Sequence, residues 1–183
     1  MALLYLSLLI ACSFAALILQ IFLPPLPWLH GAQIQLMPIV MFYGALALPY
    51  PLAMVLTFCC GLMWDLLSIQ VVDSTVEISL GWSIVIYSIL GSMMHGFRPL
   101  FLKGTWEIFS LMTGFFTGCI LVIEYLVIIF RRHHAIFPSS VWWVTFGAGV
   151  TTMLLSPLFY WLFGRLADAI RYDAETPYFE ETL

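Results

Sequence analysis

The chain has 183 residues, of which 63% are hydrophobic and 9% are charged, and its formal net charge is −4. So few charged side chains cannot form a water-compatible surface, which excludes an ordinary soluble domain and indicates an integral membrane protein. Much of the negative charge lies in the last few residues, and no basic patch suits the binding of nucleic acid.

Long apolar runs indicate membrane-spanning helices, because a backbone in lipid has to satisfy its own hydrogen bonds. The first run ends at Pro24 and Pro25, which cannot continue a helix. The second run is short and contains Pro38, so we expect a short, kinked or partly re-entrant helix there. We predict an all-α integral membrane protein with about six transmembrane helices, at residues 2–23, 33–48, 52–69, 77–97, 105–130 and 141–164.

The basic residues predict the orientation, because Lys and Arg in short loops prefer the cytoplasmic side. With six crossings and an inner amino terminus, four of the six basic residues lie inside, and Arg131 and Arg132 lie outside. We therefore expect both termini in the cytoplasm and the loop at 69–79 on the outer face. Residues 1–170 are predicted to form the polytopic transmembrane domain, and residues 171–183 an acidic cytoplasmic tail.

Two carboxylates, Asp65 and Glu124, interrupt the apolar runs. Such a group is costly and commonly functional at the bilayer centre, whereas near the interface it reaches water. Asp65 is interpreted either as an interfacial residue or as a structural or partner-binding one. Glu124 is interpreted either as a carboxyl satisfied inside the bundle or as part of one polar cluster with Asp65, Arg131 and Arg132 near the outer face.

Motifs of catalysis or cofactor binding are absent from the sequence: there is no phosphate-binding loop, hydrolase elbow, zinc-protease motif or cysteine pair typical of a metal site. We therefore expect no enzyme, no cofactor and no metal site. The basic run at 131–134 is expected to be an interfacial flank or an outer contact with an acidic partner. Small residues four apart, Ala11 with Ala15 and Gly114 with Gly118, are expected to pack helices within the bundle or against a partner.

The string GLMWDLLS at residues 61–68, followed by a loop and by LGWSIVIYSILGSMMHGFR, resembles the signature of the bacterial rod-shape-determining protein MreD family. In that family a Gly, an Asp and a Ser at this spacing end one helix, and Leu-Gly opens a helix that ends in a basic residue. The loop here is longer than is usual in the family and carries Asp73 and Glu77. The matching positions are Gly61, Asp65, Ser68, Leu80, Gly81 and Arg98.

The resemblance implies a protein of the bacterial inner membrane that acts as a scaffold in the cell-elongation machinery. Its partners would be the lipid bilayer, MreC, MreB, and the transpeptidase and glycosyltransferase that build peptidoglycan. We expect structural or partner-binding roles for Gly61, Asp65, Ser68, Asp73, Glu77, Gly81, Glu124, Arg131 and Arg132.

The family's fold is similar to the substrate-binding subunits, or S components, of energy-coupling-factor vitamin transporters. An S-component-like helical bundle is therefore expected, and a vitamin or small-molecule transporter subunit is the alternative function. In that alternative, Trp64, Trp82 and Glu124 would line the substrate cavity.

Overall fold

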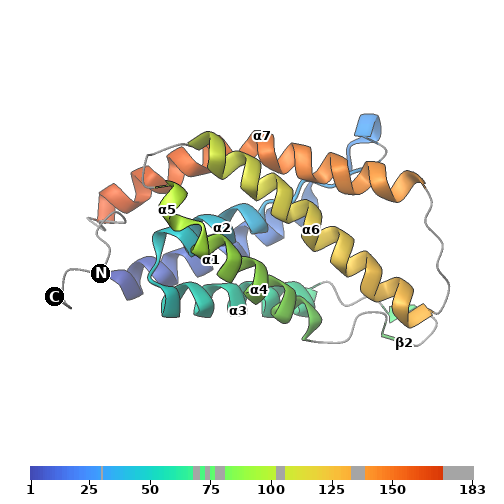
Figure 1. Cartoon of the computed structure of the whole chain (residues 1–183), viewed down its shortest axis with the longest axis horizontal. Helices are drawn as coiled ribbons and strands as arrows, with labels where there is room; N and C mark the ends of the chain where they lie inside the picture. Colours follow the sequence, from blue (N-terminus) through green and yellow to red (C-terminus); the bar gives the residue numbers. More distant parts are fainter. Residues whose placement is uncertain are drawn as a thin grey trace.

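The chain folds into a bundle of helices that run along its long axis (Figure 1). This computed structural model describes residues 1–29, 31–67, 71–72, 75–76, 81–101, 106–132 and 139–170. Between α3 and α4, strands β1 (Val71–Val72) and β2 (Thr75–Val76) pair antiparallel. The helices are α1 (Ala2–Phe22), η1 (Pro27–Leu29), α2 (Met37–Ala47), α3 (Tyr50–Leu67), α4 (Trp82–Gly96), α5 (Arg98–Phe101), α6 (Trp106–Arg132) and α7 (Ser139–Ile170).

Four of the described helices are long and apolar enough to cross a membrane: α1, α3, α6 over Trp106–Phe130, and α7 over Val141–Ile170. The prediction of an all-α membrane protein agrees with this architecture. The count of about six spans is not confirmed, because α2 has 11 residues and α4 has 15. A helix that crosses the hydrocarbon core by itself needs about 20 residues.

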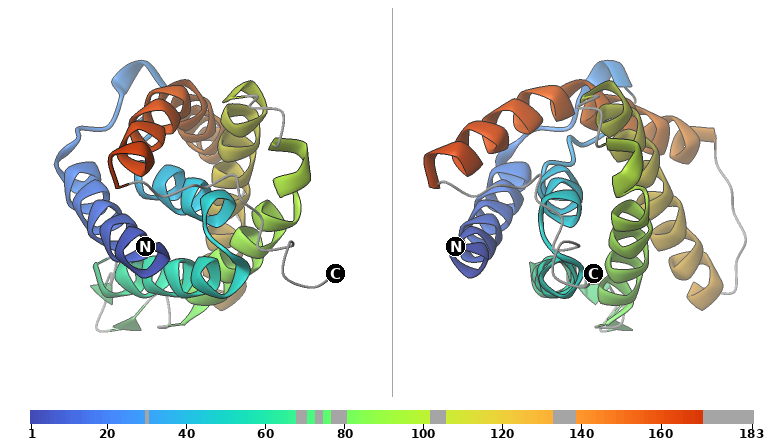
Figure 2. Two further views of the ribbon diagram at one scale, coloured as in Figure 1. Left: turned by 90° about the vertical axis from the view of Figure 1, so that its left-hand side faces the viewer. Right: turned by 60° about the vertical axis from the view of Figure 1, so that its left-hand side comes forward.

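Helix α2 lies at the centre of the bundle, where it contacts α1, α3, α4, α6 and α7 (Figure 2, left). Every one of its residues is buried. The predicted helix at 33–48 is thus shorter than expected and begins only at Met37, with Pro38 in its first turn. Proline is tolerated there because the first N–H groups of a helix have no partner inside it.

The chain enters α2 through an irregular stretch, residues 31–36, which is held between other elements of the bundle. The Leu26 N–H donates to the Ala32 carbonyl at 2.9 Å. Ala32 is fully buried, and a Cβ placed on Gly147 of α7 would lie 2.9 Å from the Ala32 Cβ. The Thr152 hydroxyl, also from α7, reaches the Gln35 carbonyl at 3.3 Å. Ala32, Gln35 and Leu36 of this stretch are buried, whereas Gln33 is exposed. Burial against protein is the condition for non-helical backbone at membrane depth.

Glycines mark the close crossings in the two helix pairs with the most extensive contacts, α3 with α4 and α6 with α7. A Cβ on Gly114 would lie 2.8 Å from the Gly149 carbonyl oxygen. The expectation that Gly114 packs helices inside the bundle is therefore confirmed, in keeping with the small residues of membrane helix contacts. Ala11 and Ala15, by contrast, lie on the exposed face of α1.

Helix α7 continues to Ile170, beyond the predicted span at 141–164, and curves over the bundle (Figure 2, right). It contains Pro157, which lacks the N–H that would bond to the carbonyl of Met153. The hydroxyl of Ser110 in α6 donates to that same carbonyl. A side chain of the neighbouring helix thus satisfies the acceptor that proline leaves open.

Candidate functional site

The junction between the end of α3 and the start of α4 contains the residues on which the family resemblance rests. Asp65 lies in the last turn of α3 and is 6% exposed. Its Oδ2 accepts a hydrogen bond from the Gly81 N–H at 2.6 Å. Gly81 is the N-cap residue of α4 and has a φ of 111°, a left-handed conformation that favours glycine. The carboxylate therefore binds the amino-terminal end of α4, where N–H groups and the helix dipole favour negative charge.

Gly61 lies one turn before Asp65 and allows the backbone of α4 to approach. A Cβ at this position would lie 2.6 Å from the Ile84 Cα and 2.9 Å from the Ile84 nitrogen. Residues four apart share one face of a helix, so Gly61 and Asp65 both face α4. We call Gly61, Asp65, Gly81 and Ile84 the α3–α4 joint. Asp65 thus makes a specific contact between two helices, and its role in partner binding stays a prediction.

Glu124 of α6 lies beside the joint and interacts electrostatically with Asp65. Its carboxyl forms a hydrogen bond with the side chain of Trp64. Its Oε1 is buried and has no hydrogen-bond partner in the described part of the chain. The Trp64 ring also packs against Tyr87 of α4, with 6.5 Å between ring centroids. Glu124 thus faces the bundle interior and keeps one acceptor that can take a further donor or a proton.

The structure tests only part of the predicted polar cluster. It brings Asp65 and Glu124 near each other, while the side chains of Arg131 and Arg132 lie outside the described atoms. Ser68, Asp73 and Glu77 lie outside the described residues as well. Their proposed roles stay predictions.

Gln20 of α1 holds the amino-terminal end of α2, a role that our sequence analysis did not assign. Its Oε1 accepts hydrogen bonds from the N–H groups of Leu36 at 2.9 Å and Met37 at 3.4 Å. Its Nε2 donates to the Gln35 Oε1 at 2.7 Å. A helix that begins inside the bundle has no water for its first N–H groups, so a neighbouring side chain has to serve them. The sequence signal that could have indicated this role was the amide side chain of Gln20 within an apolar run.

His95 of α4 holds the other end of α2. Its Nδ1 donates to the Ala45 carbonyl at 2.6 Å, and its ring packs against Tyr50 at a centroid distance of 5.4 Å. This role of His95 was not predicted from the sequence. Helix α2 is therefore bound at both ends by side chains from other helices, which fixes its position between them.

The described residues contain no group of three or more His, Cys, Asp or Glu side chains that could hold a metal ion. No protein-family model, no curated protein and no solved structure matches the chain. The resemblance stated from the sequence therefore rests on its motif residues alone.

Proposed function

We propose that the protein is a non-enzymatic membrane scaffold of the MreD type in the bacterial cell-elongation machinery. The α3–α4 joint is the observation that carries this proposal. Gly61, Asp65 and Gly81, which resemble the family signature, take part in one contact between two helices. Each of these residues packs or forms a hydrogen bond in that contact. Such roles are expected of a motif that maintains the fold and a partner-binding surface.

In this proposal the joint positions the segment between α3 and α4, which carries Asp73 and Glu77, for contact with a partner. Asp65 and Gly81 tie together the two ends from which that segment leaves the bundle. Partners with complementary basic or polar surfaces would bind there. By resemblance these partners are MreC and the peptidoglycan transpeptidase and glycosyltransferase, with MreB on the cytoplasmic side.

The arrangement of the helices supports the proposed topology in the inner membrane. The amino terminus and the end of α7 lie at the same end of the bundle (Figure 1). An even number of crossings has this property, with the irregular stretch 31–36 and α2 together serving as the second crossing and α4 as the fourth. An S-component-like bundle with both termini in the cytoplasm is therefore part of the proposal.

Site-specific photocrosslinking in rod-shaped bacterial cells tests the scaffold function. Leu67 and Trp82 are exposed at the two ends of the connecting segment, and Tyr50 is exposed at the opposite end of α3 as a matched control. We expect crosslinkers at Leu67 and Trp82 to capture MreC or wall-synthesis enzymes more strongly than a crosslinker at Tyr50. We also expect depletion of the protein to make the cells round. Unchanged cell shape together with no such capture would contradict the proposal.

A transporter substrate-binding subunit is the second candidate, and the Trp64–Glu124 contact favours it. An aromatic ring beside a carboxyl with an open acceptor is a suitable start for a small-molecule site. Trp82, the third expected lining residue, is 47% exposed at the first position of α4. Nanomolar binding of a vitamin by the purified protein, lost in Glu124→Gln, would replace the scaffold proposal with this one.

A further inference from the structure

A groove lies at the end of the bundle that contains the chain's amino terminus, between the start of α6 and the last turns of α7. Its volume is about 480 Å³. The groove is remote from the α3–α4 joint, which lies at the opposite end of α3 and α4. It is lined by Trp106, Pro157, Tyr160, Trp161, Gly164, Arg165 and Asp168.

The groove has aromatic walls, which are typical of the membrane depth at which lipid headgroups meet acyl chains. Trp106 and Trp161 are 50% and 59% exposed. Trp106 is the first residue of α6, and Trp161 lies in the last third of α7. Tryptophan gathers at this level because its ring is apolar while its N–H can bond to water or headgroups. In a membrane, the molecule that reaches such a groove first is a phospholipid.

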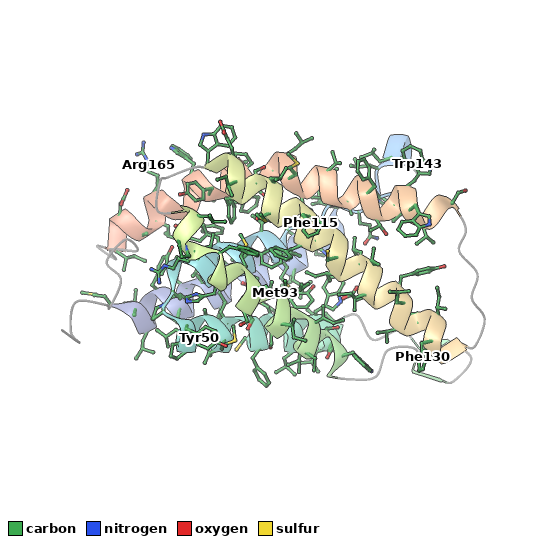
Figure 3. All side chains as sticks on the ribbon, in the orientation of Figure 1. Tyr50, Met93, Phe115, Phe130, Trp143 and Arg165 are labelled. Carbon is green, nitrogen blue, oxygen red and sulfur yellow. The ribbon has the colours of Figure 1, made fainter. Side chains whose placement is uncertain are left out.

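Two charged side chains give the groove a polar edge. The Arg165 guanidinium lies over the Trp161 ring, 5.0 Å from its centroid, a cation–π contact that orients the charge. Figure 3 shows Arg165 at this end of α7, with Tyr50 at the same end of the bundle and Trp143 at the other. Asp168 follows Arg165 by three residues, so both lie on the same face of α7. The groove therefore presents a positive and a negative group side by side.

The two charges together discriminate among phospholipid headgroups. A guanidinium binds phosphate oxygens through paired N–H donors. A carboxylate accepts hydrogen bonds from a primary ammonium, whereas a choline group carries no N–H to donate. A glycerol headgroup carries no positive charge that could pair with the Asp168 carboxylate. All three headgroups carry a phosphate that can bind Arg165. Only phosphoethanolamine combines it with an N–H-bearing cation that can bind Asp168.

We propose that this groove binds phosphatidylethanolamine, with the phosphate on Arg165 and the ammonium on Asp168. One acyl chain packs along Trp161, Tyr160 and Pro157, and the rest of the lipid stays in the bilayer. The site does not depend on the scaffold function, because neither the joint nor the segment that it positions takes part in it.

Lipid retention by the full-length protein tests the proposal. The protein is purified in mild detergent and supplied with equal amounts of phosphatidylethanolamine, phosphatidylcholine and phosphatidylglycerol of identical acyl chains, and bound lipid is measured by native mass spectrometry. We expect phosphatidylethanolamine to be retained about fivefold more than either of the others, the effect of one additional headgroup charge contact. Equal retention of the three lipids, or preference for phosphatidylglycerol, would overturn the proposal.

Substitutions at two positions separate the ammonium contact from the phosphate contact. Asp168→Asn is expected to retain all three lipids but to abolish the preference for ethanolamine over choline. Arg165→Gln is expected to lower retention of all three, whereas Arg165→Lys keeps a phosphate contact and retains more lipid than Arg165→Gln. Trp142→Leu alters an exposed tryptophan in the first turns of α7, at the opposite end from Arg165, and should change nothing. Thermal unfolding of each variant establishes that it is folded, and an ethanolamine preference that survives Asp168→Asn refutes the assigned role of Asp168.

Discussion

Asp65 and Gly81 are joined by a hydrogen bond of 2.6 Å from the backbone N–H of Gly81 to the Asp65 carboxylate. A carboxylate from one helix thus serves the amino-terminal end of the next. The pair lies 16 residues apart in the chain and closes the ends of the segment between α3 and α4. This contact holds the end of α3 next to the start of α4.

Replacing Asp65 by alanine removes the acceptor and leaves the Gly81 N–H without its side-chain partner in a partly buried place. We expect the free energy of unfolding to fall by about 1–2 kcal/mol, the usual effect of losing a helix cap or a buried hydrogen-bond partner. Asp65→Asn keeps an acceptor oxygen, so its free energy of unfolding should fall by less than that of Asp65→Ala. Thermal unfolding in detergent measures both, with Leu66→Ala at the exposed neighbouring position as the control. Equal stability of Asp65→Ala and wild type would contradict the assigned role.

Gly61→Ala introduces a methyl group where the backbone of Ile84 already lies. Backbone atoms cannot rotate away, so α3 and α4 have to separate, and we expect a loss of about 1–3 kcal/mol from overpacking. Gly118→Ala is the matched control, because nothing lies within 4 Å of its added Cβ. Denaturant unfolding of both variants compares them. If the two alanines have the same effect, the close approach at Gly61 is not what holds the joint.

Gln20→Met keeps the length of the side chain but removes its amide. The N–H groups of Leu36 and Met37 then lose their side-chain acceptor inside the bundle. We expect a loss of about 1–3 kcal/mol and faster hydrogen exchange at these two amides. Gln20→Glu keeps the acceptor and should protect both amides better than methionine does. Exchange rates that stay at the wild-type value in Gln20→Met would show that α2 is held by packing alone.

Ser110 and Pro157 are expected to be energetically coupled through the Met153 carbonyl. In the wild-type background, Ser110→Ala leaves this acceptor without its donor and should lower the free energy of unfolding by about 1 kcal/mol. In the Pro157→Ala background, the new N–H of residue 157 bonds to the same carbonyl, so Ser110→Ala should have little effect. A double-mutant cycle by thermal unfolding measures the coupling. Additive effects would refute it.

The class of the protein and the approximate positions of its long helices could be predicted from the amino-acid sequence. Apolar runs of sufficient length have to become helices in lipid, because nothing else there satisfies the backbone. For this reason α1, α3, α6 and α7 begin and end within a few residues of the predicted limits, except that α7 continues to Ile170. Pro38 likewise indicated an unusual second helix, since proline is suited only to the first turn.

The position of α2 and the groups that bind its ends could not be predicted from the sequence. Its side chains are almost all apolar, and such a pattern is compatible equally with contact with lipid and with burial among helices. Gln20, His95 and Ser110 find their partners on other elements, at distances in the chain that no local pattern encodes. The same holds for Asp65: its sequence context marked an unusual carboxylate, but the folding of α4 onto α3 made it the partner of Gly81.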